Sequence, residues 1–278
     1  MNHNENEFIG EKAFRIFYQS WLPDEKPKAI IQIVHGFGEH SGRYMNIVNK
    51  LVPLNYGIYA NDHRGNGKSD GTTNYVESFE FYVRDLKRLS DLIKENHPEV
   101  PIFMLGHSMG SGIAMTFANK YQELLKGLIL SGTGTTLGEE VSPLLKLMSK
   151  VISKILPKME IDPKLDPETL SHDPEVVKAY KEDPLVHYEK ITTRLGSEML
   201  KTFSNLESVV KDLHIPLLIQ IGSEDKAVHG SDELITFMKM EDKTVKIYEG
   251  LFHEVYNETT NEREKVLNDL VNWLESHL

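Results

Sequence analysis

The sequence predicts an α/β protein with a mostly parallel sheet, helices on both faces and one helical insertion. Short apolar runs rich in β-branched residues alternate with amphipathic stretches along most of the 278 residues. Several runs are apolar at successive positions, a pattern typical of parallel strands that are buried on both faces. Because one core of this kind accounts for nearly the whole length, we expect a single α/β domain rather than two separate ones.

Six of the apolar runs are predicted to be sheet strands, at residues 29–34, 56–60, 102–105, 128–130, 217–221 and 245–248. Helical periodicity marks residues 78–95 and 262–277. Strands that alternate with helices indicate right-handed crossovers and helices on both faces of the sheet. Residues 13–21 alternate polar with apolar side chains, and we expect an antiparallel edge strand there.

The interval from about 135 to 202 breaks this rhythm. We find no strand pattern in it, and six prolines divide it into short helical pieces: Pro143, Pro157, Pro163, Pro167, Pro174 and Pro184. It is too long for a simple crossover. We therefore expect a core of residues 1–134 and 203–278, with a helical cap of residues 135–202 over the carboxyl edge of the sheet, where open α/β sheets bind ligands.

Composition excludes several kinds of protein. The chain contains no cysteine, so disulfides, thiolate metal sites and a cysteine nucleophile are excluded. Its formal net charge of −11 argues against a nucleic-acid partner, which would need clustered Lys and Arg. Because the first residues are polar and acidic, we expect no signal peptide, and no apolar run is long enough to span a membrane. We expect a cytoplasmic protein, with peripheral association with a membrane as the remaining option.

Ser108 is the predicted nucleophile. It lies in Gly106-His-Ser-Met-Gly110, directly after a buried strand and at the start of a helix rich in small residues. In this G-x-S-x-G turn the serine is strained, and the glycines let strand and helix pass closely. The helix N-terminus also favours negative charge near the serine oxygen. Ser111 is the nearest rival, but it falls inside the predicted helix.

A serine hydroxyl needs a histidine base and an acid that orients it. In this fold the chain order is serine, then acid, then histidine. Asp225 comes just after the buried run 217–221, with Glu224 as the fallback. His253 comes just past the last strand and is favoured among twelve histidines by its position. The segment that follows His253 lacks the second histidine of a zinc-binding helix, so we expect no metal and no other cofactor.

The oxyanion hole is predicted in the glycine-rich segment that follows strand 29–34. Two backbone amides are the expected donors, those of Phe37 and of Met109. Glu39 and Arg43 are four residues apart. They form either an ion pair that fixes this loop or an exposed surface pair that adds almost nothing to stability. His35 and His40, in the same loop, are expected to be structural.

Three motifs together resemble the monoacylglycerol lipases and related lysophospholipases, of the hydrolase 4 (serine aminopeptidase-like) type. They begin at His35-Gly-Phe-Gly-Glu-His-Ser-Gly, at Asp62-His-Arg-Gly-Asn-Gly and at Gly106-His-Ser-Met-Gly. The resemblance covers nearly the whole chain and is weakest in the cap. It implies an α/β-hydrolase fold with a mostly parallel eight-stranded sheet, a triad of Ser108, Asp225 and His253, and hydrolysis of monoacylglycerols.

One position differs from the family pattern. Tyr256 stands where some members of the family carry a histidine near the site that binds the alcohol part of the substrate. In the Asp62 motif we assign the acid and Arg64 to loop structure, since the catalytic groups are supplied elsewhere.

Residues 141–156 of the cap predict a basic amphipathic helix. Lysines recur every four residues, and the remaining positions are mostly apolar, among them Leu147, Met148 and Val151. Such a helix can contact a membrane or micelle surface or line an acyl tunnel. It can equally pack on the core and leave a solvated lysine stripe. We assign these three residues, with Glu39 and Arg43, to substrate binding.

The sequence therefore predicts a serine ester hydrolase that cleaves monoacylglycerols to fatty acid and glycerol through an acyl-enzyme. The alternatives are a carboxylesterase or lysophospholipase of broader specificity, a member of the same fold that acts on peptides or carbon–carbon bonds, and an inactive lipid carrier. The expected partner is a small lipid ester.

Overall fold

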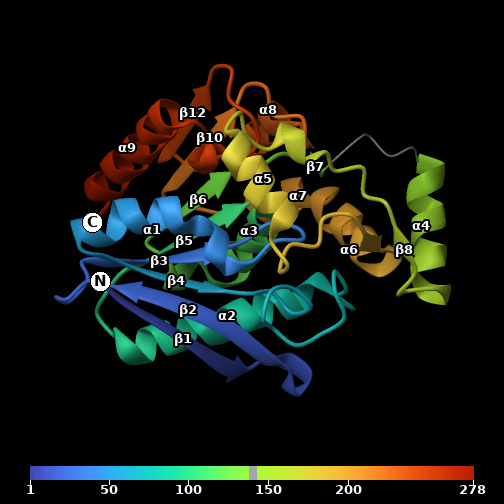
Figure 1. The fold of residues 1–278 in the computed structure, drawn as a ribbon, viewed down its shortest axis with the longest axis horizontal. Coiled ribbons are helices and arrows are strands. Elements are labelled where there is room, and N and C mark those ends of the chain that lie inside the picture. The colour runs from blue at the N-terminus through green and yellow to red at the C-terminus, as the bar shows by residue number, and fades with distance from the viewer. Residues whose placement is uncertain (138–142) are drawn as a thin grey trace.

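The central sheet has eight strands, as predicted, in the order β1-β2-β4-β3-β5-β6-β10-β12 (Figure 1). The computed structural model describes the backbone of residues 1–137 and 143–278, and the side chains of 1–136 and 148–278. The strands are β1 (Asn2–Ile9), β2 (Arg15–Leu22), β3 (Ala29–Val34), β4 (Tyr56–Asn61), β5 (Ile102–His107), β6 (Gly127–Ser131), β10 (Leu217–Gly222) and β12 (Lys243–Tyr248). All pairings from β4 to β12 are parallel.

The edge of the sheet differs from the prediction. Residues 13–21 were expected to form the edge, but β2 lies inside, between β1 and β4, and pairs antiparallel with both. The edge is β1, whose register from Asn2 opposite Leu22 to Ile9 opposite Arg15 covers all of β2. Within β1 only Phe8 is buried. An exposed polar strand has almost no hydrophobic periodicity, so the sequence pattern missed it.

Helices cover both faces of the sheet. One face carries α1 (Met45–Leu51) and α9 (Thr260–Ser276), and the other carries α2 (Phe79–Asn96), α3 (Met109–Tyr121) and α8 (Ser231–Phe237). Side chains of β3 alternate between the two cores: Ile31 and Ile33 pack with α1 and α9, whereas Ile30 and Val34 pack with α2 and α3. Both sides of a central strand are therefore apolar, which explains the continuous apolar runs.

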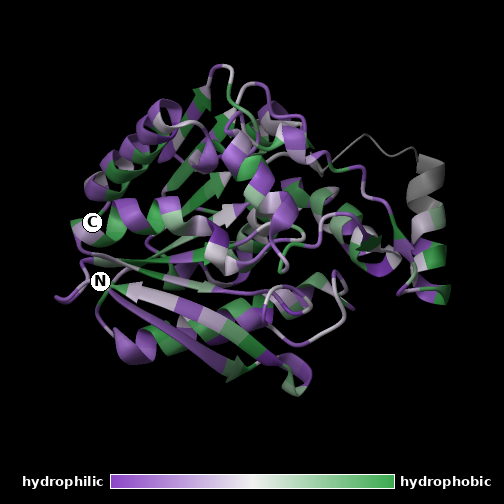
Figure 2. Cartoon of the chain, in the orientation of Figure 1, coloured by the Kyte–Doolittle hydropathy of each residue, from purple (hydrophilic) through white to green (hydrophobic). Residues whose placement is uncertain are grey.

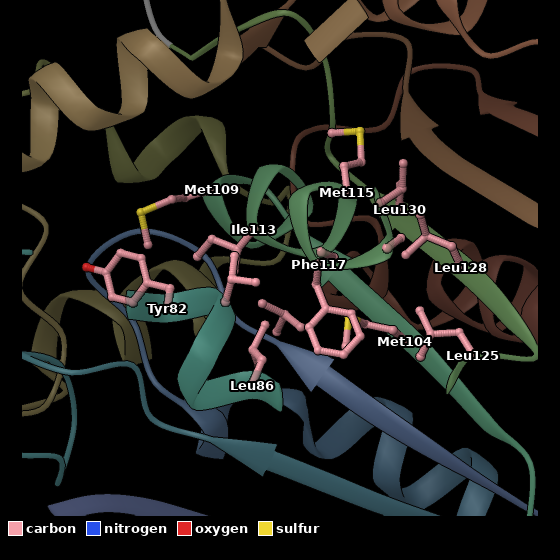
Figure 3. Packing of buried hydrophobic residues seen from close by; sticks show 14 of the residues in the cluster. Tyr82, Leu86, Met104, Met109, Ile113, Met115, Phe117, Leu125, Leu128 and Leu130 are labelled. Carbon is pink, nitrogen blue, oxygen red and sulfur yellow. The ribbon is translucent and has the colours of Figure 1, made fainter. Parts of the chain in front are cut away.

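The larger core lies between α2, α3 and the sheet. Figure 3 shows Tyr82 and Leu86 of α2 beside Ile113 and Phe117 of α3, with Met104 of β5 next to Phe117. In Figure 2 the central strands are mainly hydrophobic, whereas β1 at the edge is mainly hydrophilic. Because α3 is packed on both sides, its N-terminus has a fixed place above β5.

Between β6 and β10 the chain forms α4 (Pro143–Ile155), α5 (Pro174–Glu182), α6 (Thr193–Phe203) and α7 (Leu206–Val210). Three two-residue strands also lie here, although no strand was predicted: β7 (Thr136–Leu137), β8 (Glu160–Ile161) and β9 (Ile191–Thr192). β8 pairs with β9, and β7 pairs with β11 (Val228–His229). Two residues are too few to show a period, so the pattern could not reveal them.

Figure 1 shows α4 as an arm at one end of the molecule, separated from the sheet by α6 and β8. Short 3-10 helices complete the described elements, at Glu11–Ala13, Ser41–Tyr44, Val52–Leu54, Gln122–Leu124, Pro167–Thr169 and Val255–Asn257. Among the helices of the described ranges, none has both the length and the hydrophobicity that a membrane crossing requires.

Candidate active site

Ser108 occupies a strained turn between β5 and α3. Its φ is 53° and its ψ is −122°, a conformation that residues with a side chain rarely adopt. A Cβ on Gly110 would lie only 2.1 Å from the carbonyl oxygen of Val34, and one on Gly106 would lie 2.6 Å from that of Gly110. Both glycines are therefore required for the helix to pass this close to the sheet, as the motif predicts.

Asp225 and His253, predicted from separate strand ends, lie in direct contact. Asp225 follows β10 and His253 follows β12, and the parallel pairing of these strands brings both to one edge of the sheet. His253 Nδ1 lies 2.7 Å from Asp225 Oδ2. The other carboxylate oxygen accepts the amides of Ala227 (2.9 Å) and Val228 (3.1 Å). The fallback acid, Glu224, is exposed, and the described residues give its carboxylate no contact with the histidine.

Ser108 and His253 flank the same short segment after β6. The Ser108 amide donates to the Ser131 carbonyl at 3.0 Å. The next residue, Gly132, has φ 52°, and a Cβ there would lie 2.7 Å from Cε1 of His253. The described side chains include no hydrogen bond from the Ser108 hydroxyl to His253; such bonds often tighten only when substrate binds.

Asp225 and His253 each shift the pKa of the other toward its charged form. Burial is the largest single effect and favours the neutral form of His253. The charge and hydrogen bond of Asp225, with the charges of Glu254 and Glu39, together outweigh it and raise the pKa of His253 above its ordinary 6.5. Burial likewise opposes the charge on Asp225, yet His253 and two backbone amides lower the pKa of that carboxyl. The site therefore favours an ionised acid next to a histidine that accepts a proton readily.

Two backbone amides near Ser108 are free to bind a ligand oxygen. Met109 begins α3, and Phe37 lies in the loop after β3. Within the described chain, neither amide donates a hydrogen bond. The loop packs against Ser108, because a Cβ on Gly36 would lie 3.2 Å from Cβ of Ser108. Met109 directly follows Ser108 in the chain, and Phe37 directly follows the glycine that packs against it.

Glu39 and Arg43 form a buried ion pair rather than the exposed pair that the sequence left open. Arg43 Nη1 lies 2.8 Å from Glu39 Oε2. Arg43 also makes a two-pronged contact with Glu254, at 2.7 and 2.9 Å, and its guanidinium lies 4.5 Å from the ring centre of Tyr180. The side chains of all three charged residues are at most 10% exposed. No sequence pattern pointed to Glu254, because only folding brings it to the loop.

A cavity with room for about one water molecule lies between the loop that follows β3 and the segment 254–257. Its lining includes two acids and one histidine, Glu39, Glu254 and His107. The ring of His107 lies 4.7 Å from that of His253, and burial lowers the pKa of His107 to about 4. Tyr256, which stands where some family members carry a histidine, also lines this cavity. Its hydroxyl donates a hydrogen bond to Gln220 at 2.5 Å.

Of the three cap residues assigned to substrate binding, the structure describes the side chains of two, Met148 and Val151. The side chain of Leu147 lies outside the described residues. Met148 and Val151 on α4 are 47% and 52% exposed, and Ile155 on the same helix is 70% exposed. These side chains therefore do not line an enclosed tunnel in this conformation.

Asp62 and Arg64, which were assigned to structure, make buried contacts. Asp62 accepts the amides of Ser41 and Lys68 at 2.8 and 2.7 Å, which joins two loops. Arg64 donates to Asp85 of α2 through two bonds of 2.8 Å. Neither contact involves the residues around Ser108.

The fold and the strained serine turn define an α/β-hydrolase. Residues 25–260 match the family described as "Serine aminopeptidase, S33" (Hydrolase_4), and the chain belongs to this family. It is 35% identical to a monoacylglycerol lipase of Mycolicibacterium smegmatis, over 99% of this chain and 98% of the relative. It is 32% identical to the human monoglyceride lipase, over 93% of this chain and 86% of the relative.

A solved structure supports the same assignment. The crystal structure of Paleococcus ferrophilus monoacylglycerol lipase superimposes with a TM-score of 0.85 at 28% sequence identity, covering 95% of this chain and 99% of that one. The chain is thus a hydrolase similar to monoacylglycerol lipases.

Proposed function

We propose that the chain hydrolyses carboxylic esters through a covalent acyl-enzyme formed on Ser108. His253 takes the hydroxyl proton as Ser108 attacks the ester carbonyl, and then gives it to the departing alcohol. Asp225 holds the histidine in the orientation that exposes Nε2 to the serine. A water activated by His253 then releases the acid and restores Ser108. The observation that carries this proposal is the 2.7 Å contact between His253 and Asp225 at the strand ends beside the strained serine.

The free amides of Phe37 and Met109 are the proposed donors to the oxyanion. In the tetrahedral intermediate the former carbonyl oxygen carries a negative charge, and preorganised N–H donors stabilise it more than they stabilise the substrate. Support comes from their lack of other acceptors within the described chain and from their place beside Ser108.

The substrate that we propose is a monoacylglycerol, cleaved to a fatty acid and glycerol. Support comes from two relatives with this activity in their names that align over more than nine-tenths of this chain. Glu39 and Arg43 are proposed to shape the alcohol side of the site. Because both are largely enclosed by their own ion pairs, their contribution is to hold the loop rather than to donate many bonds to substrate.

We further propose that residues 135–202 form a cap whose outer face contacts a lipid surface. The exposed apolar residues Met148, Val151 and Ile155 lie on α4, and the neighbouring Lys150 and Lys154 are exposed as well. An apolar face bordered by lysines suits the boundary between headgroups and acyl chains. The arm-like position of α4 supports this use, because its outer side meets no other element in Figure 1.

Labelling by a fluorophosphonate probe tests the nucleophile. We expect labelling of the wild-type protein, loss in Ser108→Ala and retention in Ser111→Ala. Ser111 is a matched control, because it lies one helical turn away and its hydroxyl donates to the Ser108 carbonyl at 2.7 Å. A wild-type protein that stays unlabelled would contradict the proposed chemistry.

A substrate panel tests the proposed specificity. We expect kcat/KM for monoacylglycerols to exceed that for lysophospholipids and for p-nitrophenyl esters of equal chain length. A higher value for lysophospholipids would instead favour a lysophospholipase, and equal values for all would favour a broad carboxylesterase. An active enzyme with any other ranking leaves the serine chemistry intact and overturns only the substrate.

A further inference from the structure

His35 makes hydrogen bonds through both ring nitrogens, and these bonds fix its tautomer. Nε2 lies 2.8 Å from the backbone amide of His63. That amide can only donate, so Nε2 must accept and the ring proton must lie on Nδ1. Nδ1 lies 2.8 Å from the carbonyl oxygen of Gly36. His35 therefore donates to Gly36, and no other tautomer of a neutral ring satisfies both contacts.

The ring stays neutral at any pH at which the protein would be assayed. His35 is 1% exposed, and burial lowers its pKa to about 3. The ring of His63 lies 3.9 Å away, and its Nε2 bonds to the His35 carbonyl at 3.0 Å. The two rings are tilted by 38°, and a closely packed, hydrogen-bonded pair of this kind has little freedom to rotate.

The carbonyl held by His35 belongs to the peptide that carries the Phe37 amide. A trans peptide is planar, and its C=O and N–H point in opposite directions. Fixing the Gly36 oxygen therefore fixes the direction of the Phe37 N–H. The preceding amide, Gly36 N–H, is held as well, since it donates to Glu39 at 2.6 Å. The segment beside Ser108 is thus held on both sides.

We propose that His35 is a positioning residue for the oxyanion hole. Its Nδ1–H holds the Gly36–Phe37 peptide so that the Phe37 N–H points at the oxygen that becomes charged in the transition state. This inference rests on the proposed function, in which Phe37 is an oxyanion donor. It predicts that His35 acts on the transition state much more than on substrate binding, although the side chain itself touches no substrate.

Substitution of His35 by Leu, Asn and Gln tests the inference. Leucine fills similar space without a donor. Asparagine places an N–H near the position of Nδ1, whereas glutamine places it near Nε2. We expect H35L to lower kcat by about 10- to 100-fold with KM within about threefold, since complete loss of one oxyanion donor costs about 10²- to 10³-fold. We expect H35N to recover most of this loss and H35Q to recover little.

A trifluoromethyl ketone provides a readout that a merely structural role would not change. This inhibitor forms a charged tetrahedral adduct on the serine, so its affinity should fall in H35L by the same factor as kcat/KM. Gln32→Leu is the matched control. Gln32 lies on β3, the strand that His35 directly follows, is fully buried and makes two hydrogen bonds with α2, at 3.1 Å to Leu86 and 2.7 Å to Ser90. Q32L should lose stability and keep its kcat.

Several outcomes overturn the inference. A folded H35L with kcat within twofold of wild type, an H35N no better than H35Q, or an inhibitor affinity that does not follow kcat/KM would each do so. If H35L does not fold, the comparison of H35N with H35Q decides, because both keep a polar amide. Failure of the proposed function is distinguishable, since the wild-type protein would then hydrolyse no ester at all.

Discussion

The imidazole of His253 contacts the carboxylate of Asp225 at 2.7 Å, although 28 positions separate them along the chain. The pairing of β10 with β12 produces this contact, because each residue follows one of two adjacent parallel strands. The contact also couples the two charges, since each side chain favours the ionised form of the other.

Asp225→Asn should abolish most of the activity while leaving the fold intact. An amide at this position can present an N–H to His253 and stabilise the wrong tautomer, so we expect kcat to fall by about 10⁴-fold. Steady-state hydrolysis of a soluble p-nitrophenyl ester measures this. Glu224→Gln is the control, because this neighbouring acid is exposed; a comparable loss in E224Q would contradict the assignment of the acid.

The pH dependence of kcat/KM should follow the titration of His253. The base must be neutral in the free enzyme, so activity rises with pH through its pKa. Asp225, Glu254 and Glu39 face the ring and favour its protonated form, and the neighbouring His107 is held neutral by burial. We therefore expect the midpoint of the acid limb above 6.5, measured in buffers of constant ionic strength. A midpoint well below 6.5 would mean that burial, not charge, dominates at His253.

The contribution of Asp225 and His253 to the stability of the folded protein should fall at both low and high pH. The pKa of His253 is raised, so its stabilising contribution is complete below about 6.5 and is lost as pH rises through the folded pKa. The pKa of Asp225 is lowered, so its contribution is complete above about 3.8 and is lost as pH falls through the folded pKa. The pair thus stabilises the fold most between these two limits.

Gly110→Ala should destabilise the protein strongly. The added methyl would lie 2.1 and 2.4 Å from two carbonyl oxygens of the adjoining strand end, so backbone must move, at a cost of about 3 kcal/mol or more. Gly196→Ala is the matched control, because the nearest atom to its Cβ would be 3.9 Å away and the site lies in α6. There we expect a gain of about 0.5–1 kcal/mol from helix propensity. Chemical denaturation measures both, and equal effects would contradict the packing argument.

Arg43→Met should leave two buried carboxylates without their cation. Breaking a buried ion pair in this way costs about 3–5 kcal/mol at neutral pH. Burial opposes the charge on Glu39 and Glu254, but in the wild-type protein Arg43 lowers the pKa of both. Without it burial should raise these values, so the deficit relative to wild type should shrink as pH falls from 7.5 to 5.

Urea unfolding at the two pH values gives the comparison for Arg43→Met. The control is Lys68→Met, whose partner Glu5 is about half exposed, and which should change stability little at either pH. A deficit in R43M that is independent of pH would point to lost packing instead of unpaired charge.

Replacement of Met148 and Val151 by Asp should weaken hydrolysis of monoacylglycerol in vesicles. Both side chains are exposed on α4, and charge on that face opposes insertion between headgroups. Hydrolysis of p-nitrophenyl acetate, which needs no lipid surface, should be unchanged. Ile247→Asp is the control, because Ile247 is 54% exposed on the edge strand β12. Equal loss on vesicles and on the soluble ester would assign α4 a purely structural role.

Most of the core could be predicted because burial leaves a pattern along the chain. The predicted bounds of β3 agree with the structure at both ends, and those of β5, which leads into the serine turn, agree within two residues. Strands buried on both faces appear in the sequence as continuous apolar runs. Edge strand β1 and the two-residue strands gave no such pattern. Their pairing depends on backbone hydrogen bonds, which are independent of side-chain type.

The sequence by itself determined the strained turn at Ser108 and the strand ends that Asp225 and His253 follow, because that turn needs glycines beside the serine and apolar runs mark the strands. Only the tertiary structure decided that Glu254 joins Glu39 and Arg43, and that His35 faces the Gly36 carbonyl. The physical reason is that these contacts join side chains and backbone groups from different elements. Their burial follows from the packing of whole elements, and no local pattern records it.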